Sequence, residues 1–146
     1  MMAQAGRQLF SRLSSRTLAI APIQLHYSPT PNGWKVTMLL EEAALPYQLI
    51  PVDLAQGDQH LESFLRISPN GRMPAIVDPN CDDLSVFESG AIMVHIADSY
   101  ECASHFLGDD YACRSPILEW LFWVNAGLGA SCHASSNTKL LPCEAW

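Results

Sequence analysis

The sequence predicts a mixed α/β domain that is followed by a strongly apolar helix. Residues 23–27 read as a short strand, and a turn rich in Pro, Asn and Gly leads from it into a stretch whose apolar residues recur with helical spacing. Two further apolar runs, residues 75–77 and 84–87, flank a tight polar turn and predict a hairpin. Residues 117–124 are apolar almost all round, which predicts a final helix that is buried on several sides.

Composition places the chain among globular proteins and argues against two classes of partner. Its 146 residues suffice for one domain with its own core, and the apolar and charged fractions of 49% and 16% are those of a folded protein. The net charge of −7, without a stripe of Lys or Arg, argues against a nucleic-acid surface. No apolar run approaches the roughly 20 residues of a membrane-spanning helix, so we expect no membrane partner.

Residues 1–22 differ in composition from the rest of the chain. They contain Arg7, Arg12 and Arg16, and the first acidic residue is Glu41. A segment that is rich in Arg and hydroxyl groups and free of acid fits an organelle transit peptide, and an unstructured extension fits equally well. The first alternative predicts a mitochondrial or plastid location, the second a cytoplasmic one. In both cases the fold begins at residue 23.

The five cysteines predict neither a disulfide framework nor a metal site. Their number is odd and no Cys-x-x-Cys occurs, which is typical of reduced thiols in an intracellular protein. Cys132, His133 and Cys143 cluster near the end, but their spacing matches no established ligand pattern.

The first half of the domain reads as strand, helix, strand and short helix. After the strand at residues 23–27, a helix begins near Asn32, since Pro31 suits a first helical turn, and it ends by Leu45 because Pro46 follows. Residues 47–54 predict a second strand. A polar loop precedes a short helix at residues 60–67.

The second half reads as a hairpin and two helices. The turn at residues 68–71 precedes the strands of the hairpin, and a helix over residues 89–100 follows, with Ser89 as its predicted N-cap. His95 on this helix is expected to be a packed or hydrogen-bonded histidine and not a catalytic one. The last helix begins after Asp109 and Asp110, whose charges suit a helix N-terminus.

Three ordered motifs carry a family resemblance. They are Ser-Pro-Thr-Pro-Asn-Gly at 28–33, Leu-Arg-Ile-Ser-Pro-Asn-Gly-Arg-Met-Pro-Ala-Ile-Val-Asp at 65–78 and Phe-Glu-Ser-Gly-Ala-Ile at 87–92. Together they resemble the amino-terminal, thioredoxin-like domain of cytosolic-type glutathione transferases. The chain is most similar to the nu-class disulfide-bond oxidoreductases and to the fungal nitrogen-regulator-like branch.

The resemblance covers about residues 23–129 and implies a division of the chain. It implies a thioredoxin-like glutathione-binding domain at 23–102. The start of an all-helical C-terminal domain, cut short, follows at 109–130. Residues 131–146 are polar, non-periodic and unlike the family, and are expected to form a divergent tail.

The resemblance also assigns residues to glutathione. Glu88 and Ser89 correspond to the pair that holds its γ-glutamyl end. Met73 corresponds to the residue before a cis-proline, here Pro74, where the backbone pairs like a strand with the cysteinyl part. Gln59 corresponds to a contact with the glycyl end. Asn70 and Arg72 border the same groove. Taken alone, Glu88 and Ser89 would be assigned only to the start of a helix, and the other motifs favour the ligand site.

Thr30 and Asn32 correspond to the residues that contact the glutathione sulfur in the related branch. Their donors and the helix N-terminus can lower a thiol pKa from near ~8.5 to below neutrality, which makes the thiolate a nucleophile. Glutathione is therefore the expected co-substrate, and a small electrophile or a disulfide the second substrate. Because the turn has no cysteine, disulfide reduction would use glutathione as the thiol source.

A non-catalytic function remains the alternative. In the family the helical domain supplies the electrophile pocket and part of the dimer interface, so a shortened chain could be a glutathione-binding or protein-interaction module. Exposure of residues 120–124 would also favour association, including a homodimer. A glutaredoxin-like redox enzyme is less favoured, because no cysteine lies near Ser28.

Overall fold

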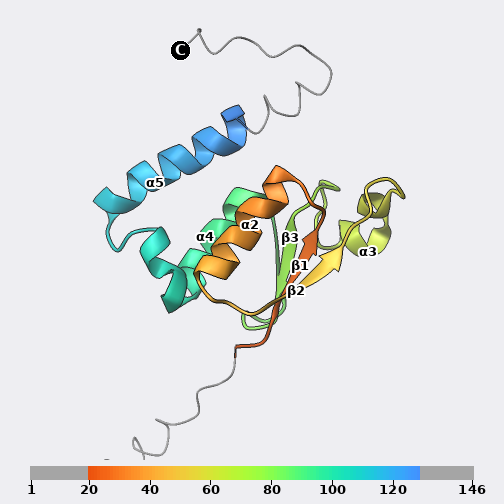
Figure 1. Cartoon of the computed structure of the whole chain (residues 1–146), viewed down its shortest axis with the longest axis horizontal. Coiled ribbons are helices and arrows are strands. Elements are labelled where there is room, and N and C mark those ends of the chain that lie inside the picture. Colours follow the sequence, from red (N-terminus) through yellow and green to blue (C-terminus); the bar gives the residue numbers. More distant parts are fainter. Residues whose placement is uncertain (1–19, 129–146) are drawn as a thin grey trace, which may run out of the picture.

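A four-stranded sheet forms the centre of the computed structural model, which describes residues 20–128 (Figure 1). Most of the predicted leader and all of the predicted tail at residues 131–146 lie outside the described residues.

The sheet has the strand order β2-β1-β3-β4. Strand β1 (Ile23–Tyr27) runs parallel to β2 (Tyr47–Pro51) and antiparallel to β3 (Ala75–Asp78). Strand β4 (Leu84–Phe87) pairs antiparallel with β3, so the predicted hairpin is confirmed. With its helices, this sheet forms the α/β, thioredoxin-like domain that the sequence predicts.

Helices cover both faces of the sheet. Helices α2 (Pro31–Glu42) and α4 (Ser89–Ser99) lie on one side, and the short α3 (Glu62–Leu65) lies on the other (Figure 1). The main core comprises fully buried side chains of β1, β3, α2 and α4: Ile23, Leu25, Ile76, Val36, Leu40, Ile92 and Ile96. A smaller cluster beneath α3 joins Phe64 to Val52 and Ala75. These cores fix the two helix starts against the sheet.

Two predicted elements have other bounds in the structure. Strand β2 stops before Asp53, because Asp53 Oδ1 accepts hydrogen bonds from the backbone N–H groups of Ala55 and Gln56 and closes a turn. The helix predicted over residues 60–67 is divided into the 3₁₀ turn η1 (Asp58–His60) and α3, since Leu61 between them is extended.

The chain after α4 forms a 3₁₀ segment, η2 (Glu101–Phe106), helix α5 (Tyr111–Trp123) and a π-helical turn, η3 (Val124–Leu128). Asp110 caps α5, because its Oδ1 accepts a 2.8 Å hydrogen bond from the backbone N–H of Cys113. Near the start of α5, Arg114 donates two hydrogen bonds of 2.8 Å to the carboxylate of Asp98 on α4.

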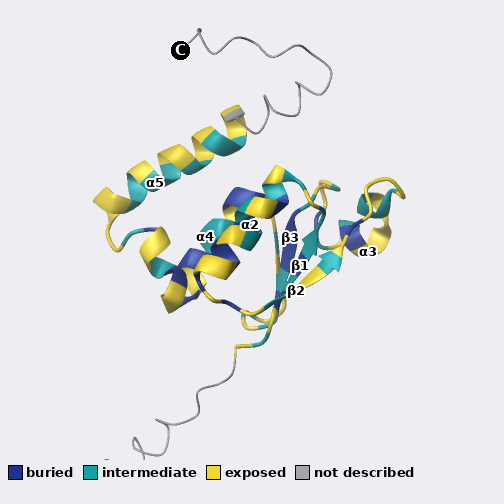
Figure 2. Ribbon diagram, in the orientation of Figure 1, coloured by how far each residue is buried: buried dark blue, intermediate teal, exposed yellow. Residues whose placement is uncertain are grey.

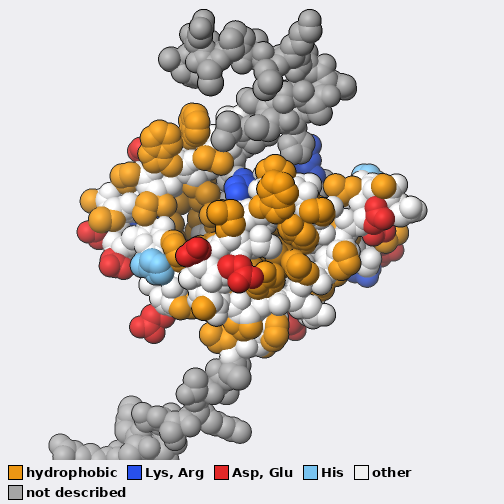
Figure 3. Space-filling view, viewed as in Figure 1, with side chains coloured by type: hydrophobic (Ala, Val, Ile, Leu, Met, Phe, Trp, Pro, Cys, Tyr) orange, Lys and Arg blue, Asp and Glu red, His pale blue; other side chains and the backbone are white. Residues whose placement is uncertain are grey.

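The predicted burial of the last helix is wrong for the part that the structure describes. No residue of α5 is buried, and the exposed fractions of Trp120, Phe122 and Trp123 are 66%, 67% and 52%. Figure 2 shows only intermediate and exposed residues on α5, and Figure 3 shows hydrophobic side chains gathered over it. Leu121, which is half-buried, lies beside Gly90 of α4.

Within the described part of the chain, every helix is too short or too polar to cross a membrane.

Candidate functional site

A groove of about 480 Å³ lies where the first turn of α2 and the turn before β3 approach the start of α4. Its lining residues come from segments far apart in the sequence: Asn32, Leu54, Gln59, Asn70, Gly71, Arg72, Met73, Pro74, Glu88, Ser89 and Asn125. Six of the seven predicted site residues are among them, and Thr30 is not. The fold thus brings the three sequence motifs together at one place.

Thr30 joins the turn after β1 to the groove indirectly. It is the N-cap of α2, and its Oγ1 accepts a 3.5 Å hydrogen bond from the backbone N–H of Gly33. The same hydroxyl donates to Met73 Sδ at 3.8 Å, so it lies beside a residue that lines the groove. Asn32, two residues later, lines the groove itself.

The peptide bond between Met73 and Pro74 is cis, which confirms the conformation that the resemblance implies. Pro74 is buried and Met73 is half-buried, and both line the groove directly before β3 begins.

Glu88 and Ser89 lie where α4 begins, but Ser89 is not its N-cap as predicted. Glu88 takes that position with a φ of 71°, in the left-handed region, and makes no side-chain cap, whereas Ser89 is the first helical residue. Glu88 Oε1 accepts a 3.0 Å hydrogen bond from Asn70 Nδ2. The carboxylate is thereby oriented at the groove, and the first N–H groups of α4 lack a side-chain cap.

Gln59 contributes a polar atom that has no partner among the described residues. Its Oε1 is buried without a hydrogen bond, while its Nε2 lies 3.3 Å from His60 Nε2. Since a buried amide oxygen is stabilised by a donor, a ligand N–H in the groove would satisfy it.

The structure adds Asn125 and Lys35, which the sequence did not identify. Asn125 Oδ1 accepts hydrogen bonds from Lys35 Nζ at 2.6 Å and from Ser89 Oγ at 3.3 Å, so η3 reaches the start of α4. Burial lowers the pKa of Lys35, and the carboxylate of Glu88 opposes that effect. A cation therefore lies close to the groove wall.

Of these two residues, only Lys35 could have been identified from the sequence pattern. Lys35 follows Asn32 by three residues, and residues with this spacing share one face of a helix. The place of Asn125 depends on how η3 returns to α4, which no local pattern encodes.

The groove can bind a ligand that carries a positively charged group and a negatively charged group. Uncapped N–H groups at the start of α4 and the hydroxyl of Ser89 suit an anion, and the carboxylate of Glu88 suits an ammonium group. At the other side, Asn32 and the N-terminus of α2 suit a second anion such as a thiolate.

Comparisons with known proteins identify relatives over the same residues. The family profile described as "Glutathione S-transferase, N-terminal domain" matches residues 22–98. The disulfide-bond oxidoreductase YfcG of Escherichia coli K12 is 50% identical over 111 residues, which are 73% of this chain and 50% of that protein. The chain thus spans about half the length of this curated relative.

Solved structures of glutathione transferases are also similar to this chain. A glutathione transferase family member of Pseudomonas fluorescens Pf-5, with two glutathione molecules bound, has a TM-score of 0.69 and 37% identity, covering 84% of this chain and 53% of that one. A glutathione transferase of Pseudomonas putida, with one glutathione disulfide bound per subunit, also has a TM-score of 0.69, with 33% identity, covering 87% and 54%.

Proposed function

The chain belongs to the glutathione S-transferase family, and on that premise we propose that it binds glutathione in the groove and directs its thiolate at disulfides or small electrophiles. The observation that carries the proposal is the convergence of Asn32, Gln59, Met73, Pro74, Glu88 and Ser89 on one groove. Relatives with bound glutathione or glutathione disulfide support the choice of ligand.

The start of α4 would hold the γ-glutamyl end of glutathione. Glu88 accepts hydrogen bonds from the α-ammonium, with Asn70 orienting its carboxylate. The hydroxyl of Ser89 and the first N–H groups of α4 donate to the α-carboxylate, where the helix dipole favours a negative charge.

The middle and the glycyl end of glutathione would follow the opposite wall. The backbone of Met73, before the cis bond to Pro74, aligns the cysteinyl part beside the start of β3. Gln59 offers its unpaired Oε1 to a glutathione amide N–H.

Thr30 and Asn32 would activate the sulfur. In the proposal the hydroxyl of Thr30, which now donates weakly to Met73 Sδ, and the amide of Asn32 donate to the glutathione sulfur. Together with the N-terminus of α2 they stabilise the thiolate and lower the thiol pKa.

The thiol in this chemistry comes from glutathione. Among the described residues, Cys81, Cys102 and Cys113 are free and none lines the groove. The thiolate attacks one sulfur of a disulfide and forms a mixed disulfide, while the other sulfur leaves as a thiolate and takes a proton. A second glutathione thiolate then displaces the remaining substrate thiol, so that two glutathione molecules are oxidised and one disulfide is reduced. With an electrophile, the same thiolate forms a thioether.

The paired substitution Thr30→Ala and Asn32→Ala tests the assignment. Because both donors act on the developing thiolate, we expect kcat to fall about 100-fold or more in a glutathione-dependent disulfide reduction assay. The Kd for glutathione, measured by calorimetry, should change far less, since the γ-glutamyl contacts remain.

Thr37→Ala is the matched control, because within residues 20–128 the Thr37 hydroxyl donates only to the backbone oxygen of Trp34 on the exposed side of α2. Unchanged turnover in the paired variant would refute the role of Thr30 and Asn32. Absence of glutathione binding to the folded wild-type chain would refute the proposed function itself.

A further inference from the structure

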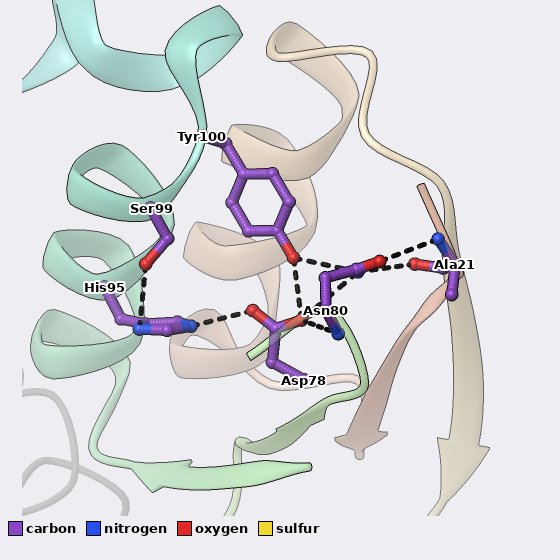
Figure 4. A network of polar contacts seen from close by, with 6 residues as sticks. All are labelled: Ala21, Asp78, Asn80, His95, Ser99 and Tyr100. Carbon is purple, nitrogen blue, oxygen red and sulfur yellow. Dashed lines mark hydrogen bonds and ion pairs between the residues drawn. The ribbon is translucent and has the colours of Figure 1, made fainter. Parts of the chain in front are cut away.

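A second cluster of reactive side chains lies at the far end of β3 from the groove. Asp78 is the last residue of β3, Cys81 lies in the turn that follows, and His95 projects from α4 (Figure 4 shows Asp78 and His95). One donor atom from each of the three lies within 4.8 Å of the other two. The closest pair, Asp78 Oδ2 and His95 Nε2, is separated by 2.8 Å.

The three donors are of the kinds that bind a divalent transition metal ion. A thiolate, an imidazole nitrogen and a carboxylate oxygen are the protein ligands of Zn²⁺, with bonds of roughly 2.0 to 2.3 Å. Around a tetrahedral ion such ligand atoms stand roughly 3.3 to 3.8 Å apart. The 2.8 Å between Asp78 and His95 lies below that range, and the 4.8 Å limit for the three atoms lies above it. Small rotations of the partly exposed His95 and Cys81 side chains would therefore bring the three atoms to the spacing of metal ligands.

Outer hydrogen bonds hold two of the three donors in place. Asp78 Oδ1 accepts from Tyr100 Oη at 2.7 Å and from the backbone N–H and Nδ2 of Asn80 at 3.0 and 3.2 Å, which leaves Oδ2 directed at His95 (Figure 4). On the far side of the imidazole ring, His95 Nδ1 lies 3.3 Å from Ser99 Oγ. Metal sites use such partners to fix the tautomer and the direction of their ligands.

From this arrangement we propose that Asp78, Cys81 and His95 form a binding site for a divalent transition metal ion such as Zn²⁺, with water as the fourth ligand. The cation takes the place of the hydrogen between Asp78 Oδ2 and His95 Nε2, and that proton moves to His95 Nδ1, from which it can be donated to Ser99 Oγ. The cation also displaces the proton of the Cys81 thiol, so one metal–sulfur bond forms and one proton is released to solvent.

Affinity for the ion should rise with pH. The ion binds the thiolate of Cys81 and the unprotonated Nε2 of His95, so protons compete with it for these ligands. Beside the three ligands lie Tyr100 at the end of α4, Asp98 on α4 and Asp82 in the turn. The site is independent of the proposed function, because none of its three ligands lines the groove.

Titration of the reduced, metal-free full-length chain with Co²⁺, without glutathione, tests the site. We expect one Co²⁺ per chain with a thiolate-to-cobalt charge-transfer absorption band, and Zn²⁺ should displace the cobalt. Cys81→Ser should abolish the band and lower affinity about 100-fold, and Ser99→Ala about 10-fold.

Cys102→Ser is the matched control, since Cys102 is exposed and outside the cluster. A paired Cys132→Ser and Cys143→Ser variant tests the tail, and both controls should keep the band. Because Asp78 is fully buried, its replacement risks unfolding, and His95→Gln serves as the second ligand variant.

Persistence of the band in Cys81→Ser, or its loss only when the tail cysteines are replaced, would overturn the proposal. So would unchanged Co²⁺ affinity in a His95→Gln variant whose circular dichroism matches that of the wild type.

Discussion

The hydroxyl groups of Tyr100 and Tyr47 make similar hydrogen bonds in different surroundings. Tyr100 donates to Asp78 at 2.7 Å inside the protein, and Tyr47 donates to Glu41 at 2.6 Å near the surface. Burial by itself would raise the pKa of Asp78, but hydrogen bonds from Tyr100, His95 and Asn80 outweigh burial and lower it. These hydrogen-bond donors thus keep the buried carboxylate of Asp78 ionised.

Tyr100→Phe should therefore destabilise the protein more than Tyr47→Phe. Removing the buried donor leaves a buried carboxylate less satisfied, and we expect the free energy of unfolding to fall by about 1–3 kcal/mol. The surface substitution should stay within about 0.5 kcal/mol of the wild type. Urea denaturation of the two variants measures both values, and equal losses would contradict the argument.

His26 predicts a dependence of stability on pH. Burial lowers the pKa of its imidazole, its Nε2 has no hydrogen-bond partner within residues 20–128, and its ring packs 5.9 Å from that of Phe64. Below the unfolded-state pKa of about 6.5, the unfolded chain binds a proton that the folded chain resists. The free energy of unfolding should therefore rise with pH up to that value and level off above it.

The substitution His26→Phe should flatten this part of the profile, because it keeps a ring beside Phe64 and removes the titrating group. Urea denaturation between pH 5 and pH 8, chosen to span about one unit or more on each side of 6.5, provides the measurement. His60→Phe at an exposed position should leave the slope unchanged. A wild-type slope in His26→Phe would show that another group is responsible.

At the scale of elements, the turn between β1 and α2 depends on a close approach. A Cβ atom on Gly33 would lie 2.6 Å from Tyr27 Cε2 and 2.8 Å from the backbone oxygen of Ser28, closer than real contacts allow. Gly33 is buried in the first turn of α2, directly after Asn32. The turn therefore has no room for a side chain.

Gly33→Ala should displace this turn and lower stability by about 1–3 kcal/mol, with weaker glutathione binding in calorimetry. Gly127→Ala is the matched control, because among the residues that the structure describes its Cβ would meet only Trp123 Nε1, at 4.0 Å. Wild-type stability and binding in Gly33→Ala would mean that the turn can relax without cost to the groove.

Local signals in the sequence predicted most element bounds. Strands β1 and β4 have the predicted bounds, because Pro, Asn, Gly and Asp residues delimit them. The end of β2 was missed, because it depends on which backbone groups the side chain of Asp53 reaches. The burial of α5 could not be predicted either, since it depends on which surface faces the helix and not on its own sequence.

Six of the seven predicted site residues line one groove, and the three local motifs, each beside the start of a helix or strand, carry all of the predicted residues except Gln59. Their proposed roles remain predictions. Asn125 was missed because it reaches the groove only through the path of α5 and η3, a tertiary feature without a local pattern. The cluster at Asp78 was missed for the same reason, since β3, a turn and α4 each supply one residue.

For the whole molecule, the exposed aromatic side chains of α5 predict self-association. Trp120 and Trp123 pack edge to face at 5.5 Å and, with Phe122, form an exposed apolar surface. In sedimentation velocity we expect the wild-type chain to shift to larger species as its concentration rises. Trp120→Gln with Phe122→Gln should shift it toward the monomer.

Met38→Gln replaces one exposed apolar side chain on α2 and should leave the association unchanged. A wild-type chain that sediments as a monomer at all concentrations would contradict the prediction.

Polar contacts attach helix α5 to the domain near its two ends. Arg114 binds Asp98 near its start, and Lys35 binds Asn125 just beyond its end, while no residue between them is buried. Ionic strength screens such contacts and leaves apolar cores intact, so salt should loosen α5 while the sheet stays folded. Because Asn125 lines the groove, the shape of the groove would then vary with the salt concentration. Faster amide hydrogen exchange at high salt, confined to α5 and η3, would reveal this loosening of the helix.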